Sequence, residues 1–379
     1  MFSALDVDLK PGHGLSIFVT GTSLWTLLDT LRRNPHKYPQ IEVKYDPDTT
    51  ATTPIIVHVK PHLDLLFSGK HQRLNTICIR RLRDLNPPVT VRYQDTIMSS
   101  PKEVLRRVGV SKVFGPTYPG EELRYPGLWF SFEEDGLAEG MKAPQVGDRM
   151  QEVKRILISQ IEPENKIRDA LDEVMECPLM VGDIARAVVK VHEGVTLYFY
   201  PTSSNSSVNI KLGETTAQDL LLELGAPLRT HYKDDERMKI HAATQKGDQT
   251  DSGYFYNYFQ HGIDFLISGS THVVKKIILH TNVPGSPLFQ RYKRCNWEIE
   301  GHPEDDEDDT PPRKRFYDRF ETIGHFLSPR SDPPPSMILD RTDDEEHLNL
   351  PNSTTHLHGY DGIILEVTVL SQVVSITIF

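Results

Sequence analysis

Residues 63–77, LDLLFSGKHQRLNTI, and residues 263–277, IDFLISGSTHVVKKI, carry the same pattern of strand, tight turn and strand. Apolar residues alternate with other residues along each strand, and a Ser-Gly pair stands at each turn, as expected of antiparallel hairpins. Two further copies, the second of them looser, occur at 363–379 and at 128–136 continued by 153–159. Because the repeated positions are mostly apolar, the repetition indicates a scaffold rather than a chemical site.

A short amphipathic helix is predicted upstream of each hairpin. The four segments are residues 22–33, 99–109, 215–227 and 318–327. Ser23 or its neighbour Thr22 is the expected N-cap of the first helix, and Ser100 of the second, which Gly109 would end. In the third, Thr216 and Asp219 have the spacing of a capping box.

Together these elements predict an α+β fold, made of tandem repeats of a strand–helix–antiparallel-meander module with sheets packed against short helices. A glycine, Gly127, Gly262 or Gly362, stands directly before the hairpin in three copies. The predicted divisions are a first α+β unit 1–85, a second unit 86–160 with an inserted loop 137–149, a connecting helix and strand 161–207, a third unit 208–300, an acidic, proline-containing disordered linker 301–315, and an interrupted fourth unit 316–379. Since one such unit is marginal alone, neighbouring units are expected to pair.

Composition narrows the class of protein. The chain has 379 residues, 38% apolar and 25% charged, with a net charge of −11. Six of those negative charges lie in the run 304–309, so the rest of the chain has no strong excess of either sign, and nucleic-acid binding is not predicted. The three cysteines are far apart, and the sequence has no signal-peptide layout and no apolar stretch of membrane-spanning length. These features predict a cytoplasmic protein with reduced cysteines.

The sequence contains sixteen histidines, a residue type common in catalytic and metal-binding sites. Five of them fall within the third unit: His231, His241, His261, His272 and His280. None has HExxH spacing, and no nucleophile elbow or phosphate-binding glycine-rich loop occurs. We therefore predict no enzyme, no metal site and no cofactor.

The densest aromatic run is YFYNYF, residues 254–259. On a strand, Tyr254, Tyr256 and Tyr258 would lie on one face and Phe255 and Phe259 on the other. A buried core strand is the main interpretation. The alternative is a direct lipid or small-ligand binding protein, with a cleft between the sheets lined by the three tyrosines.

Basic residues occur in short clusters, of which Lys275-Lys276 lies on a predicted strand of the third unit. Near an anionic membrane each basic residue contributes roughly 1 kcal/mol to binding. The main interpretation of the basic clusters is nevertheless that they are solvated residues at strand ends and helix C-termini, and membrane contact by Lys275-Lys276 is the alternative.

Several longer motifs carry a family resemblance. They are LGETTAQDLLLELGAP (212–227), YFYNYFQHGIDFL (254–266), THVVKKIILHTNVPG (271–285) and YKRC (292–295), with LDVDLKPGHGL (5–15), LLFSGKHQRL (65–74) and GLWFSFE (127–133). In this order they resemble the phagosome (phagophore) assembly factor 1 family, over nearly the whole chain.

The resemblance implies a non-enzymatic autophagy adaptor in the cytoplasm. Members of the family work with a WD40 β-propeller partner and associate with phosphoinositide-containing membranes at the phagophore assembly site. The family supplies no catalytic residues to carry over. We expect partner or membrane binding at an exposed edge or face of the third unit, through polar residues of the motifs: Lys275, Lys276, His272, His280, Asn282 and Asn257.

Overall fold

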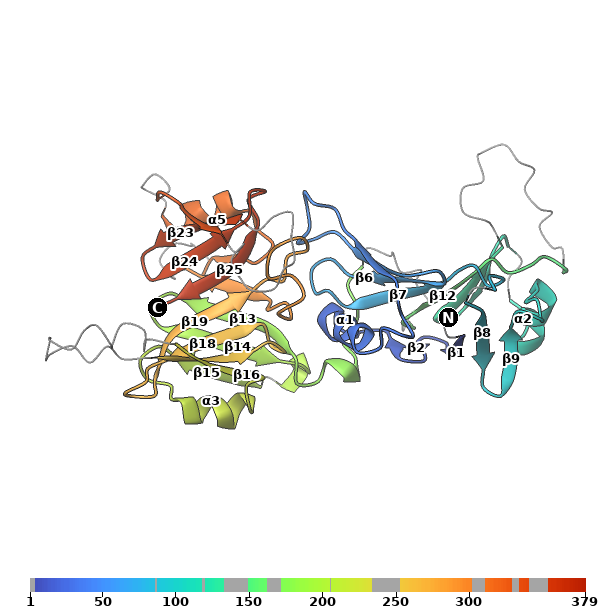
Figure 1. Ribbon diagram of the computed structural model, residues 1–379, viewed down its shortest axis with the longest axis horizontal. Coiled ribbons are helices and arrows are strands. Elements are labelled where there is room, and N and C mark those ends of the chain that lie inside the picture. Colours follow the sequence, from blue (N-terminus) through green and yellow to red (C-terminus); the bar gives the residue numbers. More distant parts are fainter. Residues whose placement is uncertain are drawn as a thin grey trace, which may run out of the picture. The chain divides into compact units, whose positions relative to one another are not determined.

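The computed structural model describes residues 4–85, 87–117, 120–132, 149–161, 172–204, 206–233, 253–301, 311–328, 334–340 and 354–379. The acidic run 304–309 and residues 137–148 of the predicted inserted loop lie outside these ranges. The chain divides into two units, unit 1 (Met1–Leu179) and unit 2 (Met180–Phe379) (Figure 1).

Unit 1 contains two sheets. Its strands are β1 (Leu5–Lys10), β2 (Gly14–Leu15), β3 (Phe18–Val19), β4 (Ile41–Lys44), β5 (Ile55–Val59), β6 (Leu63–Phe67), β7 (Leu74–Ile79), β8 (Val89–Tyr93), β9 (Thr96–Ser99), β10 (Leu123–Tyr125), β11 (Leu128–Ser131) and β12 (Arg155–Ser159). Its described helices are α1 (Leu24–Arg32) and α2 (Arg107–Phe114). One sheet has the order β3-β2-β1-β8-β9 and the other β10-β11-β12-β7-β6-β5-β4.

Unit 2 has the same plan. Its strands are β13 (Ile184–Lys190), β14 (Gly194–Phe199), β15 (Ser207–Lys211), β16 (Arg229–Tyr232), β17 (Tyr254–Tyr258), β18 (Ile263–Ile267), β19 (Val274–His280), β20 (Trp297–Glu300), β21 (Arg313–Arg315), β22 (Met337–Asp340), β23 (Thr354–Tyr360), β24 (Ile363–Val367) and β25 (Val373–Ile378). Its described α-helices are α3 (Ala217–Leu224) and α5 (Phe320–Leu327). The sheet orders are β15-β14-β13-β20-β21 and β16-β17-β18-β19-β25-β24-β23-β22.

Each unit is built from two modules that share both sheets. The first strands of the two modules pair in parallel, β1 with β8 and β13 with β20. The last strands pair antiparallel, β7 with β12 and β19 with β25. The α+β prediction and the expected pairing of neighbouring units are confirmed. Within the segment 161–207, β13 and β14 belong to the five-stranded sheet of unit 2 and open its first module.

The hairpin turn of every module caps the helix of the same module. The first N–H groups of a helix have no acceptor within it, and here the first of them donates to a backbone carbonyl of the turn. The donor and acceptor pairs are Leu24 to Gln72 (2.8 Å), Arg107 to Gln151 (2.9 Å), Ala217 to His272 (2.8 Å) and Phe320 to Ser371 (3.1 Å). Gln72, His272 and Ser371 have φ of 50°, 56° and 60°, so the same left-handed turn geometry recurs in three copies.

Three of the hairpins also contain a β-bulge at the same position. The register shifts by one residue in β6–β7, β18–β19 and β24–β25. The extra residues are Asn75, Lys275 and Val374. Asn75 and Val374 are buried, whereas Lys275 is exposed.

Local signals predicted three of the four described helices, α1, α3 and α5, and misplaced α2. The Ser23 hydroxyl caps α1, and Thr216 and Asp219 form the expected capping box of α3. In the second module, Ser100 caps only a single turn, through a 3.0 Å bond from the Glu103 N–H. The helix α2 begins at Arg107 instead and includes Gly109.

Tertiary contacts explain the displaced start of α2. The Arg107 N–H is the group that docks on the Gln151 carbonyl. Its guanidinium also donates to the carbonyls of Gly120 and Glu121, both at 3.1 Å. These partners lie 13 or more residues away from Arg107 in sequence. Their hydrogen bonds determine where α2 begins, in place of the local capping signal at Ser100.

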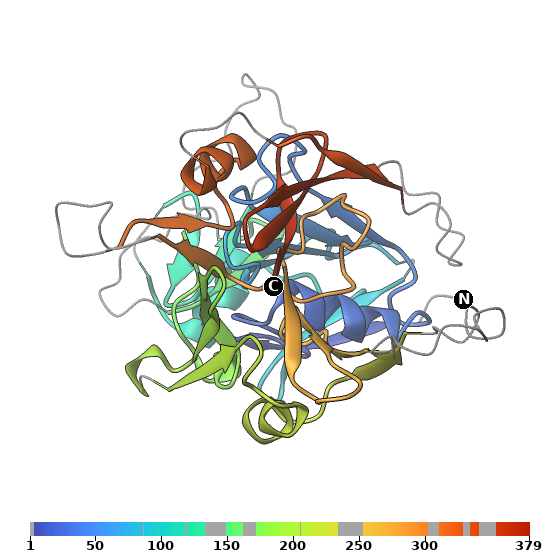
Figure 2. The ribbon, with the colours of Figure 1, turned by 90° about the vertical axis from the view of Figure 1, so that its left-hand side faces the viewer.

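The core of unit 2 lies between its two sheets. Buried residues from both sheets, α3 and α5 form one cluster, in which Trp297, Tyr258 and Phe265 are fully enclosed. Figures 1 and 2 show α3 and α5 at opposite ends of this unit. Tyr254 and Tyr258 on β17 belong to the cluster while Phe255 does not, which confirms the core interpretation of the aromatic run.

Candidate functional site

The six residues expected to bind a partner lie on β17, β19 and the loops that flank β19. Lys275 and Lys276 on β19, and His272 in the hairpin turn, reach the surface. Asn257, His280 and Asn282 are buried, with 8%, 5% and 3% of their surface exposed. The six residues therefore separate into a surface group on the hairpin and a buried group.

Asp264 on β18 binds two of the buried residues. One carboxylate oxygen accepts a hydrogen bond from the Asn257 amide at 2.8 Å. The other lies 2.9 Å from Nε2 of His280 and accepts the Tyr292 hydroxyl at 2.7 Å. The rings of His280 and Tyr292 stack with centroids 3.6 Å apart. Because buried polar groups must find partners inside the fold, this cluster has a structural role.

Asn282 also acts within the fold. Its side-chain oxygen accepts the backbone N–H of Gln290 at 2.8 Å, and its own backbone has φ of 51°. It thereby fixes the path of the chain between β19 and β20.

Unit 1 has a polar cluster at the same place in its repeat. Asp64, which occupies the position of Asp264, lies 2.6 Å from Nδ1 of His58 and 2.9 Å from the Arg80 guanidinium. A sequence signal for these clusters was present, because the aspartate follows the first residue of both hairpins. Its recurrence at a repeated position is typical of an internal role.

The surface group consists of exposed residues of the β18–β19 hairpin. The bulge turns Lys275 outward beside Lys276, since a bulge redirects the side chains of its strand. The Lys276 ammonium lies 5.2 Å from the ring centroid of Phe379. His272 is held by a 2.9 Å hydrogen bond between its Nδ1 and the Tyr254 hydroxyl, and burial raises the pKa of that tyrosine. We call Lys275, Lys276, His272 and Phe379 the β19 surface.

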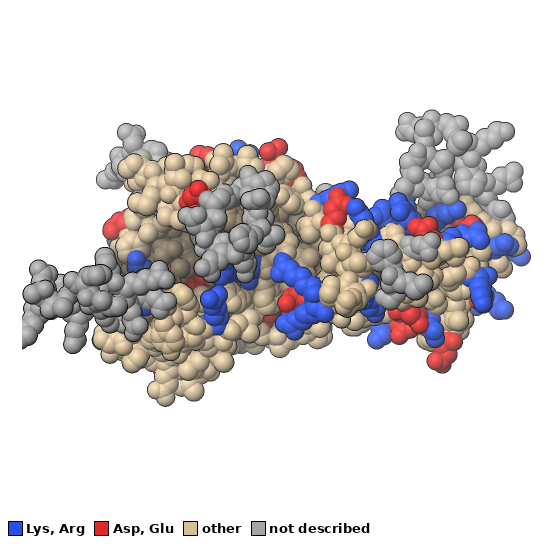
Figure 3. Space-filling model, in the orientation of Figure 1, with Lys and Arg blue, Asp and Glu red and all other residues tan. Residues whose placement is uncertain are grey.

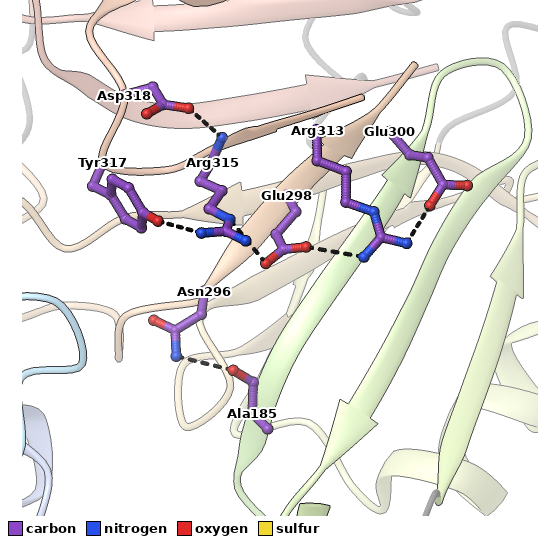
Figure 4. A network of polar contacts seen from close by, with 8 residues as sticks. All are labelled: Ala185, Asn296, Glu298, Glu300, Arg313, Arg315, Tyr317 and Asp318. Carbon is purple, nitrogen blue, oxygen red and sulfur yellow. Dashed lines mark hydrogen bonds and ion pairs between the residues drawn. The ribbon is translucent and has the colours of Figure 1, made fainter. Parts of the chain in front are cut away.

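A second basic region at β21 is neutralised by its neighbours. Arg313 pairs with Glu298 and Glu300 on β20, at 3.4 and 2.7 Å. Arg315 also contacts Glu298, at 3.4 Å, and its backbone N–H donates to Asp318 (Figure 4). An open hollow of about 560 Å³ borders these arginines. Because carboxylates surround its basic groups, the hollow is a poor site for an anion.

A groove that the sequence analysis did not predict lies between β15 and α3. It has a volume of about 300 Å³. Its lining residues are Ser207, Val208, Asn209, Ile210, Thr215, Asp219, Leu220 and Glu223. Four of them are consecutive on β15, which is the terminal strand of its sheet.

Neither hollow supports the tyrosine-lined cleft. Tyr254, Tyr256 and Tyr258 border neither of them, and Tyr258 is fully buried. Within the described part of the chain, no three His, Cys, Asp or Glu residues are grouped as metal ligands. None of the described helices has the length and apolar character needed to cross a membrane. Figure 3 shows basic side chains over parts of unit 1, while the end of unit 2 that carries α3 is uncharged on this face.

Comparison with known proteins gives one consistent result. The family model described as phagosome assembly factor 1 (PHAF1) matches residues 14–379. A PHAF1 protein of Arabidopsis thaliana is 28% identical over 399 aligned residues, covering 98% of this chain and 92% of the relative. PHAF1 proteins of Caenorhabditis elegans and Drosophila melanogaster are 27% and 25% identical, each over 99% of this chain and 92% and 94% of their own lengths. No solved structure matches the chain. The match therefore covers both units, and the chain belongs to the phagosome assembly factor 1 family.

Proposed function

We propose that this chain is a non-enzymatic autophagy adaptor. It binds a WD40 β-propeller protein and is recruited with it from the cytoplasm to phosphoinositide-containing membranes at the phagophore assembly site. Membership of the phagosome assembly factor 1 family supports a role in autophagy. The observation that carries the proposal is the β19 surface, where two adjacent lysines are exposed on a strand that otherwise faces mostly into the core.

The geometry of the β19 surface suits an interface with an anionic partner. The strand fixes the positions from which both lysines extend, and the Lys276 ammonium lies next to the exposed aromatic ring of Phe379. Such a mixture of basic and aromatic side chains favours a membrane headgroup region or an acidic protein surface. His280, Asn257 and Asn282 contribute indirectly, by holding β17, β18 and β19 in place.

The test reverses the charge of both lysines. In the double variant Lys275→Glu, Lys276→Glu, binding to phosphatidylcholine vesicles that contain a phosphoinositide should fall at least about thirtyfold, since each lysine contributes roughly 1 kcal/mol. Recovery of a WD40 protein, identified by mass spectrometry after affinity purification of the tagged chain, should fall with it. The thermal unfolding temperature should stay unchanged because both side chains are exposed.

The matched control carries the same charge change in unit 1. Lys102 and Lys112 are exposed, and the variant Lys102→Glu, Lys112→Glu should keep both activities. Unchanged vesicle binding and WD40 recovery in the β19 variant would contradict the proposed interface. If vesicle binding survives and only WD40 recovery is lost, the membrane contact belongs to the partner or to another face.

A further inference from the structure

We propose that the groove between β15 and α3 binds an extended peptide segment with basic side chains, which adds to the sheet as a further strand. The proposal does not depend on the adaptor role assigned above. It rests on three properties of the groove: an open strand edge, an apolar floor and an acidic wall.

The hydrogen-bonding groups of β15 establish the open edge. The N–H of Lys211 points away from β14 and donates to the Thr215 hydroxyl at 2.9 Å, while the N–H of Leu212 points toward β14 and donates to Glu193 at 2.9 Å. Directions alternate along an antiparallel strand. Ser207 and Asn209 therefore direct their backbone N–H and C=O groups into the groove.

The apolar floor of the groove is formed by β15 and α3, and its acidic wall by α3. Ile210 of β15 and Leu220 of α3 are buried in the core of unit 2 and form the apolar base. Asp219 and Glu223 lie one helical turn apart on α3 and line the same groove. Hydrogen bonds from the backbone and hydroxyl of Thr216 lower the pKa of Asp219, so this carboxylate stays ionised at neutral pH.

Charge distinguishes this edge from the opposite edge of the same sheet. At β21 the basic residues face their own acidic neighbours. At the β15 groove, no described lysine or arginine forms an ion pair with Asp219 or Glu223, and the nearby Lys211 is bound to Glu214 at 3.0 Å. An edge strand beside a helix is the arrangement in which peptides bind by strand addition. The acidic wall selects lysine or arginine on the face of the peptide that points to α3.

The test uses short capped peptides and the full-length chain. A peptide of alternating lysine and valine should bind, as measured by fluorescence polarisation, and should slow amide exchange at 207–211. A peptide of alternating glutamate and valine should bind at least about tenfold more weakly, because it loses charge-assisted hydrogen bonds. A lysine–valine peptide N-methylated at every residue should not bind, because it keeps the charge but neither of its edges can join the sheet.

Variants locate the site. Glu223→Lys should weaken binding of the lysine–valine peptide at least about tenfold. Gln218→Lys adds one positive charge, half the change made by Glu223→Lys, at an exposed residue of α3 that does not line the groove. It should change the affinity less than about twofold. Asn209→Pro removes one N–H donor at a strand edge, where proline is tolerated, and it should prevent binding while the chain stays folded by circular dichroism.

Three results would overturn the proposal. The first is no binding of the lysine–valine peptide, or equal binding of the N-methylated form. The second is equal loss of affinity in Glu223→Lys and Gln218→Lys. The third is an oligomer, seen by light scattering, that dissociates in Glu223→Lys, because the groove would then hold the β21 edge of a second copy.

Discussion

His261 is the residue whose protonation the fold opposes most clearly. It lies in the turn between β17 and β18, with its ring centroid 6.2 Å from that of Tyr258 and 6.3 Å from that of Phe199. Burial, together with the Lys293 ammonium, lowers its pKa to about 4, although Asp183 acts in the opposite direction. At neutral pH the imidazole is uncharged, so folding does not bury a charge at this position.

The lowered pKa predicts an acid-sensitive unit 2. The unfolded chain takes up a proton near pH 6.5, while the folded chain does so only near pH 4. The contribution of His261 to the free energy of unfolding is therefore fully present above pH 6.5. This contribution falls by roughly 3 kcal/mol as the pH drops from 6.5 to 4. His261→Phe should remove this part of the acid sensitivity, as measured by urea unfolding at pH 7 and at about pH 4.5 with pulsed hydrogen exchange on unit 2. The exposed His231 gives the control His231→Phe; equal acid sensitivity in wild type and His261→Phe would contradict the prediction.

At the residue scale, sequence reasoning identified polar residues but not their partners. His280, Asn257 and Asn282 were expected at a binding surface because they are polar residues of the family motifs. The structure gives them internal partners 7 to 16 residues away. Only the folded hairpins bring those residues together, and one sequence cannot show that pairing.

At the scale of elements, the turn before three of the four hairpins depends on a glycine. Gly127, Gly262 and Gly362 have φ of 68°, 70° and 67°, a left-handed conformation that glycine adopts at little cost. At Gly262 the approach of other backbone is also close, because a Cβ there would lie 2.0 Å from the Lys293 carbonyl oxygen.

Two glycine substitutions separate backbone strain from crowding. Gly225 has φ of 77° but open space where an alanine Cβ would stand, so Gly225→Ala should cost only about 1 kcal/mol in unfolding free energy. Gly262→Ala combines the same strain with a backbone clash and should cost about 3 kcal/mol or more. Chemical denaturation of both variants measures the difference. Equal losses would show that the chain near Lys293 moves aside without cost.

Helices and strands could be predicted from the sequence where residues close to them in the chain determine them. Alternation predicted the hairpins, and capping residues predicted α1 and α3. The start of α2 depends on Gln151, Gly120 and Glu121, all distant in sequence, and was misplaced. The parallel pairs β1–β8 and β13–β20 join strands far apart in sequence, so no local pattern announces them. The β15 groove was missed for the same reason.

At the scale of the whole molecule, the unit of folding is a pair of modules. Every described strand pairing of unit 2 is made within Met180–Phe379. We predict that this fragment, expressed alone, folds and unfolds cooperatively. The fragment 180–296 should fail to fold, because it lacks β20 and β25, which pair with β13 and β19. Circular dichroism and amide exchange of both fragments provide the measurement, and a folded 180–296 fragment would show that one module is sufficient.

The position of β25 has a consequence for how the protein is made. β25 follows every other strand of unit 2 in sequence, yet it lies between β19 and β24 in the middle of the eight-stranded sheet. Until β25 is in place, β16–β19 and β22–β24 are two separate half-sheets, and the edges at β19 and β24 are unpaired. Such edges are templates for wrong pairing, so misassembly of unit 2 is favoured until its final strand joins the two halves.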